Sequence, residues 1–213
     1  MTDFLTTGPG GDAPRLILAH GAGASMNSAF LEGMAEALVR RGVSVTRFEF
    51  NYMAQRRTGG LKRPPPKVVQ LMEEFRAAVA EAGGVGRVFI GGKSMGGRVA
   101  SMIADELFAA GQIKGLVCLG YPFHPPGKPG ALRVAHLEGM VCPALIVQGE
   151  RDPLGTRSEV EGYALSAAIR VEWLGDGDHD FKARRPSGFS QAQHIETAAE
   201  MVARFVTQAT GER

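Results

Sequence analysis

The sequence predicts an α/β fold, in which a mostly parallel sheet of about six or seven strands carries helices on both faces. Short apolar runs rich in β-branched residues alternate along the chain with longer segments whose apolar residues recur at helical spacing. Such alternation is typical of parallel strands joined by right-handed helical crossovers. The 213 residues suffice for one domain with a substantial core. We therefore expect a single domain over residues 1–213, with an irregular N-terminal segment at 1–13.

The first half of the chain contains two predicted strands and two predicted helices. Residues 16–19 form a short apolar run that stops at His20-Gly21. Residues 27–41 carry an apolar stripe at helical spacing. Residues 43–50 alternate as a strand does, and residues 67–82 form a second amphipathic helix.

The second half repeats this alternation. The predicted elements are a strand at 87–91, a helix from Ser94 to about Ala110, strands at 116–119, 144–147 and 169–173, and a helix at 191–208. Ligand sites of parallel sheets form beyond the carboxyl ends of the strands. The loops that follow these strands should therefore meet at one edge of the sheet.

The strand at 87–91 leads into the pattern Gly-x-Ser-x-Gly at residues 92–96, directly before a helix of small residues. A strand, a tight turn and a helix in this order form the nucleophile elbow of a serine hydrolase. The turn is so sharp that the flanking segments would collide without small residues, and Gly92 and Gly96 fill those places. We therefore predict that Ser94 is a nucleophile held in a strained backbone conformation.

The same letters also resemble the end of a phosphate-binding loop, G-x-x-x-x-G-K-[ST]. That motif requires a glycine five positions before Gly92, where this chain has Arg87. The residues between the two read as a strand, whereas a phosphate-binding loop needs an open anion cradle. A nucleotide site is therefore not expected.

A serine hydroxyl needs a base within hydrogen-bond reach, and the base needs an orienting partner. In this architecture the order along the chain is serine, acid, histidine. Asp152 follows one buried strand and His179 lies in the loop after the next. We predict that Asp152 orients His179 and that His179 accepts the Ser94 proton, with Glu150 as the reserve acid. Asp152 and His179 each have an alternative role. An Asp before proline often forms a turn, and a loop histidine flanked by acids is often only solvated.

Acyl transfer also needs hydrogen-bond donors for the negative charge that develops on the carbonyl oxygen. One donor is expected to be the backbone amide of Met95, the residue after the nucleophile. The second is expected from the glycine-rich loop after the first apolar run, with Ala22 as the choice. The alternative is a flexible glycine turn, which does not explain why this loop lies at the same sheet edge.

No cofactor or metal is expected. The alternating aspartates at 176–180 resemble the start of a calcium loop, but Phe181 and Ser187 stand where that loop needs glycine and glutamate. The two cysteines, Cys118 and Cys142, lack the spacing of a zinc site. We expect them as buried free thiols, with a disulfide as the alternative.

Composition excludes further classes of function. The net charge of +2 is too small to indicate nucleic-acid binding, and no apolar run approaches the ~20 residues of a membrane span. The N-terminus lacks the charged start and apolar centre of a signal peptide. We expect a cytoplasmic protein that binds neither nucleic acid nor membrane. The sequence carries no indication of the oligomeric state.

Basic residues cluster near the expected site. Residues 52–67 contain five basic side chains and no acid, and Arg98 lies near another loop of the same edge. A basic rim could steer an anionic substrate, and the alternative is a solvated loop whose charge is balanced elsewhere. The candidate substrate-binding residues are His20, Arg56, Arg57, Lys93 and His124.

With these motifs in this order, the chain resembles the α/β-hydrolase superfamily. The matching segments are His20–Gly23, Gly92–Gly97, Gly149–Pro153 and Gly177–Phe181, which span nearly the whole chain. The set looks closest to the small dienelactone-hydrolase-like branch that includes the testis-expressed Tex30 and KAT8 NSL-complex proteins. The resemblance implies a Ser-His-Asp hydrolase without implying a substrate. Dienelactone hydrolases carry a cysteine nucleophile, so Ser94 argues against dienelactone cleavage.

The leading hypothesis is a cofactor-free serine hydrolase, a carboxylesterase or thioesterase acting on a small ester or thioester whose acyl part can be anionic. The alternative is a non-catalytic binding or scaffold protein on an α/β-hydrolase fold, because some relatives in this branch act as complex subunits. Residues 123–138, where a cap domain would be inserted, have room for a loop and one short helix. The site is therefore expected to be open or lightly covered, with minimal or no cap domain.

Overall fold

The computed structural model describes residues 2–83 and 86–211 of the chain. Its centre is one seven-stranded sheet in the order β1-β3-β2-β4-β5-β6-β7. The strands are β1 (Phe4–Thr7), β2 (Arg15–Ala19), β3 (Ser44–Phe48), β4 (Val88–Lys93), β5 (Gly115–Leu119), β6 (Ala144–Gly149) and β7 (Ile169–Leu174). Neighbouring strands from β3 to β7 are all parallel. The predicted mostly parallel sheet is confirmed.

The first strand was not expected. β1 runs antiparallel along β3, with Phe4 opposite Phe48 and Thr7 opposite Val45. The expectation of an irregular segment over 1–13 is therefore wrong at 4–7. Four residues are too few to predict a strand on their own, and this one forms because the free edge of β3 offers it hydrogen-bond partners.

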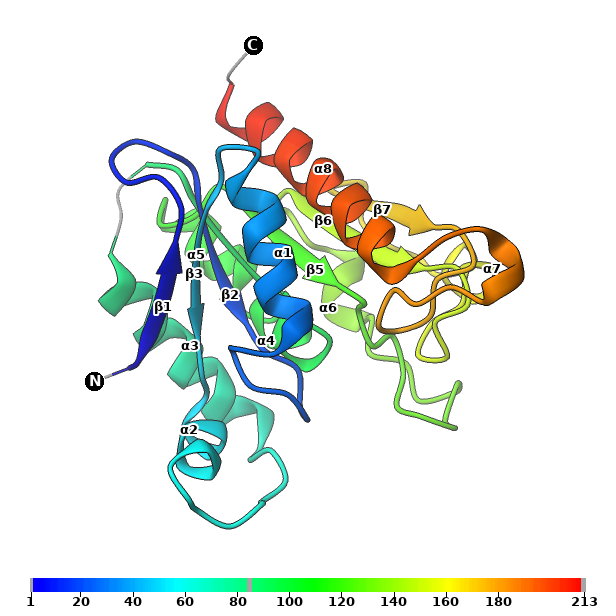
Figure 1. The fold of residues 1–213 in the computed structure, drawn as a ribbon, viewed down its shortest axis with the longest axis horizontal. Helices are drawn as coiled ribbons and strands as arrows, with labels where there is room; N and C mark the ends of the chain where they lie inside the picture. Colours follow the sequence, from blue (N-terminus) through cyan, green and yellow to red (C-terminus); the bar gives the residue numbers. More distant parts are fainter. Residues whose placement is uncertain (1, 84–85, 212–213) are drawn as a thin grey trace.

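Helices cover both faces of the sheet, as Figure 1 shows. α1 and α8 pack against each other on one face, while α3, α4 and α5 cover the other. The helices are α1 (Ala29–Val39), α2 (Asn51–Arg57), α3 (Val68–Ala82), α4 (Met95–Ser101), α5 (Ala104–Ala109), α6 (Ala135–Glu138), α7 (Arg157–Val160) and α8 (Gln191–Thr210), with a 3-10 turn at Arg185–Ser187. The carboxyl ends of the parallel strands share one edge of the sheet, which in Figure 1 extends from the lower end of β3 to the right-hand end of β7.

Each buried strand contributes side chains to two hydrophobic cores, one on each face of the sheet, because successive side chains of a strand point to opposite faces. In β2, Leu16 and Leu18 pack with the apolar residues of α1 and α8, while Ile17 and Ala19 pack with those of α3 and α4. All four are fully buried. This two-sided burial explains why β2 reads as a continuous apolar run rather than an alternating one.

The helix expected from Ser94 to about Ala110 is instead two helices, α4 and α5. At the break, the amides of Met102 and Ile103 bond to carbonyls three residues back, at 3.2 Å each. Within the last turn of α4, the Ser101 hydroxyl donates to the carbonyl of Arg98 at 2.7 Å. A serine that bonds back to the preceding turn bends a helix, and the sequence pattern did not reveal this.

Residues 52–67 were expected as a loop, but their first part belongs to α2. Between β5 and β6 the chain forms a loop and the short helix α6, which confirms the absence of a separate cap domain there. Cys118 and Cys142 are buried and free, as the sequence predicts. Within the described part of the chain, no helix combines the length and apolar character needed to cross a bilayer.

Substitution of Phe75 by alanine is predicted to lower the free energy of unfolding by about 3–5 kcal/mol, because it empties a buried aromatic site. Phe75 of α3 is fully buried, and its ring centroid lies 4.9 Å from that of Phe48. Urea unfolding of the two proteins measures the difference. Val69→Ala on the same helix is the control, since Val69 is 62% exposed, and its effect should stay within about 0.5 kcal/mol. Equal effects of the two substitutions would contradict this account of the core.

Candidate functional site

Ser94 lies between the end of β4 and the start of α4. Its backbone has φ 53° and ψ −116°, a positive φ that side-chain-bearing residues rarely adopt. Its amide donates to the carbonyl of Leu119 on the neighbouring β5, at 3.0 Å. The strained turn is thus tied to the sheet and lifts the Ser94 side chain above the strand ends.

The glycines on either side of Ser94 are required by crowding. A Cβ at Gly92 would lie 2.4 Å from the carbonyl carbon of Gly96, and a Cβ at Gly96 would lie 2.6 Å from the carbonyl oxygen of His20. Both distances are shorter than real Cβ contacts allow. The sequence interpretation of these two glycines is confirmed, because α4 could not begin so close to β2 with any larger residue.

Three side chains from three different loops form a hydrogen-bonded chain. The Nε2 atom of His179 lies 2.9 Å from Oγ of Ser94, and its Nδ1 atom lies 2.7 Å from Oδ2 of Asp152. These loops follow β4, β6 and β7. The structure therefore brings together the serine, histidine and aspartate that the sequence singled out.

Asp152 is fully buried and its carboxylate is held from two sides. Oδ2 accepts from the amide nitrogen of the Gln148 side chain at 2.8 Å, besides its bond to His179. Oδ1 accepts from the backbone amide of Leu154 at 2.8 Å. Since a buried charge is tolerated only when it is paired and hydrogen-bonded, these contacts fix the carboxylate as an acceptor for the imidazole.

The histidine loop is anchored on both sides of His179. Asp178 Oδ1 accepts the backbone amides of Asp180 and Lys182, each at 2.9 Å. Phe181 is fully buried against the ring of Phe30, with centroids 5.2 Å apart. The loop is therefore built by its own backbone bonds and one apolar anchor.

Asp176 closes the same loop through ion pairs with Arg151 and Arg184. Hydrogen bonds from Arg184 hold the pKa of Asp176 at about 2. Within the part of the chain that the structure describes, no group of His, Cys, Asp or Glu is placed to hold a metal ion.

Ala22 and Met95, the predicted oxyanion-hole residues, line cavities that also contain Ser94. Within residues 2–83 and 86–211, neither of their backbone amides donates a hydrogen bond to another protein group. The Ala22 segment is held in place because the Tyr52 hydroxyl donates to the Ala22 carbonyl at 3.0 Å. Burial raises the pKa of Tyr52 to about 12, so its hydroxyl stays protonated as that donor near neutral pH.

Two cavities meet at Ser94, and both are also lined by Ala22. The first, here the Lys93 cavity, measures about 520 Å³ and contains His179, Asp180 and Phe30 in its wall. The second, here the Arg98 cavity, measures about 370 Å³ and is lined by Met95, Arg98, Arg133, and apolar residues of α3 and the proline-rich loops. The Ser94 hydroxyl can therefore meet a molecule that extends to both sides.

Lys93 is the one predicted substrate-binding residue that lines a cavity beside Ser94. Its ammonium nitrogen lies 3.5 Å from Asp180 Oδ1 and 5.4 Å from the centre of the Phe30 ring, and the side chain is 9% exposed. Burial lowers the pKa of Lys93, and the attraction of Asp180 and Asp152 opposes that shift. Its charge is thus already partly neutralised by the protein.

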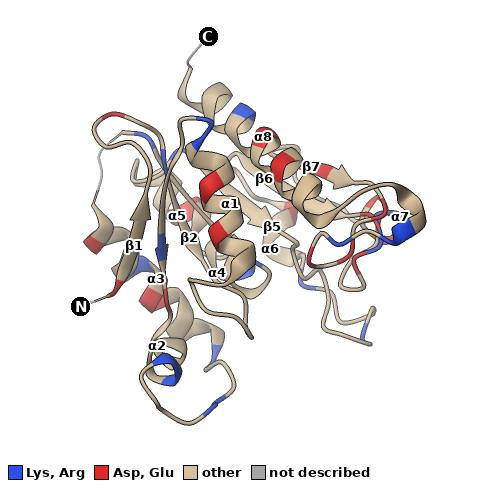
Figure 2. Cartoon of the chain, viewed as in Figure 1, with Lys and Arg blue, Asp and Glu red and all other residues tan. Residues whose placement is uncertain are grey.

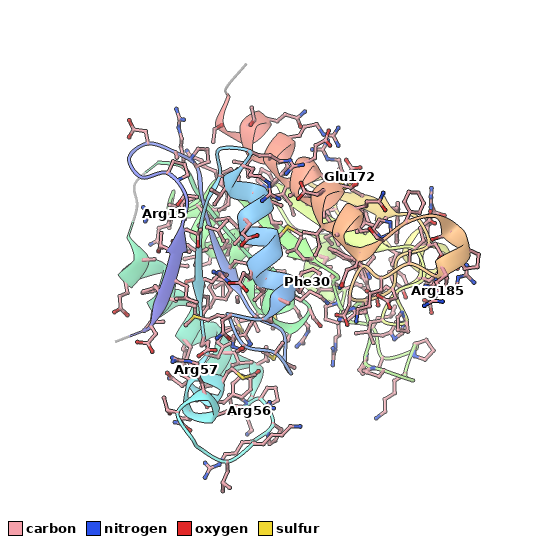
Figure 3. All side chains as sticks on the ribbon, viewed as in Figure 1. Arg15, Phe30, Arg56, Arg57, Glu172 and Arg185 are labelled. Carbon is pink, nitrogen blue, oxygen red and sulfur yellow. The ribbon has the colours of Figure 1, made fainter. Side chains whose placement is uncertain are left out.

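The other predicted substrate-binding residues lie outside both cavities. Buried His20 accepts the Phe50 amide through Nε2 at 3.1 Å and supports the backbone beside the glycine-rich loop. Arg56 and Arg57 are on α2 at the edge of the molecule (Figure 3), where Lys and Arg gather in Figure 2. Arg57 is paired with Glu49 and Asp3, and His124 lies 3.6 Å from Glu159.

Sequence reasoning missed Gln148 and Arg133. Gln148 is a polar side chain on an otherwise apolar strand, a signal that could have marked it as a partner of Asp152. Arg133 lies in a loop without a motif and is brought to the site only by the fold. Glu150, the reserve acid, instead accepts from Arg157 and the Asp176 amide.

A second Ser–His contact exists in the structure. The Ser101 hydroxyl lies 2.8 Å from Nε2 of His136 and also donates to the carbonyl of Arg98. Burial lowers the pKa of His136, and the nearby Arg98 charge lowers it further. Within the described residues, no carboxylate accepts a hydrogen bond from His136, so this pair lacks the third member that the Ser94 site has.

A family model described as "Alpha/beta hydrolase domain" matches residues 12–207. The chain therefore belongs to the α/β-hydrolase family. Similar solved structures include an α/β serine hydrolase homologue from Coxiella burnetii (TM-score 0.70, 18% identity, 95% of this chain and 90% of that one). Est1E from Butyrivibrio proteoclasticus with bound ferulic acid matches with a TM-score of 0.69 and 16% identity, over 99% of this chain and 96% of that one. A dienelactone hydrolase from Anabaena variabilis matches with a TM-score of 0.69 and 20% identity, over 97% of this chain and 91% of that one.

Substitution of Gly96 by alanine is predicted to destabilise the fold by about 1–3 kcal/mol, because the added methyl group would overlap the carbonyl of His20. Chemical denaturation measures the loss. The matched control is Gly130→Ala, where an added Cβ would meet nothing within 4 Å. A Gly96→Ala protein as stable as the Gly130→Ala protein would show that the turn can relax without cost.

Proposed function

We propose that this protein is a cofactor-free serine hydrolase that cleaves carboxylic esters or thioesters through an acyl-enzyme on Ser94. The single observation that carries the proposal is the unbroken hydrogen-bonded chain from Ser94 Oγ through His179 to buried Asp152. The protonated Nδ1 of His179 donates to the Asp152 carboxylate, which leaves Nε2 of the imidazole as the acceptor for the serine proton. The serine thereby gains the base that it lacks in water.

In the proposed acylation step, Ser94 Oγ attacks the carbonyl carbon of the substrate as His179 Nε2 takes its proton. The carbonyl oxygen becomes negatively charged, and the amides of Ala22 and Met95 are the donors assigned to it. When the tetrahedral species collapses, His179 returns the proton to the leaving oxygen or sulfur. The leaving group departs as an alcohol or thiol and the acyl group stays on Ser94.

Deacylation repeats these roles with water. His179 removes a proton from water as the water oxygen attacks the acyl carbon, and it then protonates Ser94 Oγ. The products are the carboxylic acid and the regenerated serine. The contact of His179 Nδ1 with the buried carboxylate of Asp152 stabilises the imidazolium that forms twice in each cycle.

Ser94 is favoured over Ser101 as the nucleophile. Ser94 is at the junction of both cavities, whereas Ser101 lies inside the last turn of α4 and already donates to a backbone carbonyl. A buried serine whose proton is committed to the helix cannot reach a substrate carbonyl.

Esters are the first choice of substrate because, within the described residues, only a loop and the short helix α6 join β5 to β6 and no cap domain is inserted there, which leaves room for varied ester substrates. Three solved structures share the fold of this chain at 14–16% identity. They are Est1E, the esterase domain of a Rhodothermus marinus protein, and a monoacylglycerol lipase from Paleococcus ferrophilus. The segments His20–Gly23 and Gly92–Gly97 support a narrower place beside the Tex30 and KAT8 NSL-complex proteins.

Labelling with a fluorophosphonate probe tests the proposed nucleophile and base. Wild type should be labelled, and labelling should be lost in Ser94→Ala and in His179→Ala, because neither variant can form an activated alkoxide. Ser101→Ala is the control and should be labelled as wild type is. A folded wild type that resists the probe would instead favour a non-catalytic binding protein.

Asp152→Asn is predicted to lower kcat about 10⁴-fold, because the Leu154 amide would hold the asparagine oxygen and the NH2 group would donate to Nδ1, which leaves the imidazole proton on Nε2, the wrong tautomer. Hydrolysis of a p-nitrophenyl ester measures the rate. Glu150→Gln is the matched control and should lose less than about tenfold, since Glu150 faces Arg157 rather than the imidazole. A comparable loss in both variants would reassign the acid.

A further inference from the structure

We propose that the Arg98 cavity is an anion-binding acyl subsite, so that the preferred substrates carry a carboxylate or phosphate group on their acyl chain. This inference rests on the proposed function, since it gives the chemical class of the acyl group that Ser94 would receive. It assigns roles to two arginines that the mechanism does not use.

The two guanidinium groups share one cavity without a counter-ion. Arg98 is one turn into α4 and its amide donates to the carbonyl of Ser94, so its side chain leans back toward the nucleophile. Arg133 reaches the same cavity from the loop before α6. No acidic residue lines this cavity, and within the described residues neither guanidinium forms an ion pair with a carboxylate.

One nitrogen of this pair lacks a partner altogether. The Nε atom of Arg98 is buried and, within residues 2–83 and 86–211, makes no hydrogen bond. Burial and the like charge of Arg98 both lower the pKa of Arg133. An anion between the two arginines would balance their charge and relieve their repulsion. Guanidinium groups match the oxygens of carboxylate and phosphate in bidentate geometry.

The position of His179 assigns this cavity to the acyl part. The leaving group must receive its proton from His179, and His179 lines the Lys93 cavity but not the Arg98 cavity. The leaving group therefore departs on the Lys93 side. The acyl chain extends to the other side, past Met95 and the apolar side chains of Val68 and Leu71, toward the arginines.

Lys93 does not provide a comparable anion site. Its ammonium group already faces Asp180 and the Phe30 ring. Arg57 is likewise paired with Glu49 and Asp3. An entering anion would have to displace these carboxylates, whereas at Arg98 and Arg133 it would displace none.

Matched esters test the proposal. Three p-nitrophenyl monoesters, of succinic, glutaric and adipic acid, carry a terminal carboxylate at increasing distance from the scissile bond. Butanoate, pentanoate and hexanoate esters are their uncharged counterparts, and an ester with a terminal phosphate distinguishes the two anions. The ratio of kcat/KM for the charged ester to that for its uncharged counterpart should exceed one in wild type. It should fall by about 10- to 100-fold in Arg98→Gln and in Arg133→Gln.

The control variant is Arg204→Gln, which removes the same charge from α8 on the opposite face of the sheet. It should keep the wild-type ratio. Arg133→Lys keeps the charge without the planar fork and should retain part of the preference. Arg133→Gln alone carries the test if Arg98→Gln does not fold. Ser94-dependent hydrolysis with a ratio that neither arginine variant changes would overturn the subsite and leave the hydrolase standing.

A binding measurement separates the subsite from catalysis. Glutarate and inorganic phosphate are titrated by calorimetry into wild type, Arg98→Gln, Arg133→Gln and the control Arg204→Gln. Binding of either anion that is weakened in Arg98→Gln and Arg133→Gln, but kept in Arg204→Gln, would support the subsite even if no ester were hydrolysed. Equal binding of both anions in all four proteins, or none in wild type, would overturn it.

Discussion

The close approach of α4 to β2 is the constraint on which the site depends. Gly92 pairs with Ala19 on one side and Cys118 on the other, so the turn begins in the middle of the sheet. A single methyl group at Gly92 or Gly96 would overlap backbone atoms of α4 or β2. This crowding forces the chain through a positive φ at Ser94 and starts a helix at the next residue. The hydroxyl and the Met95 amide thereby gain fixed positions at one sheet edge.

The buried charge of Asp152 fixes the positions of the other site residues. Asp152 has no exposed surface, so its carboxylate depends on Gln148, the Leu154 amide and His179 for compensation. Loss of any partner would leave a buried anion incompletely paired. The imidazole is therefore held by the same contacts that make the carboxylate tolerable in the interior, and the Phe181 anchor holds the loop that carries it.

The sequence was sufficient to predict those features that depend on residue types close together along the chain. The elbow glycines, the buried apolar runs and the order of Ser94, Asp152 and His179 could all be read from residue types and spacing. The sequence could not reveal features that arise from distant contacts. β1 forms because β3 has a free edge, and the bend after α4 depends on a side-chain bond of Ser101. Arg133 reaches the site only through the path of its loop, and the pairing of Arg57 with Glu49 and Asp3 likewise arises only from the fold.

Formation of a covalent acyl group on Ser94 is the central claim, and trapping that intermediate tests it most directly. The protein would be mixed rapidly with excess p-nitrophenyl acetate, quenched in acid and examined by intact-mass and peptide-mapping mass spectrometry. The account predicts a burst of p-nitrophenol close to one equivalent, with one acetyl group on the peptide that contains Ser94 and none on that peptide in His179→Ala. Turnover without an adduct, or an acetyl group on Ser101 in place of Ser94, would contradict it.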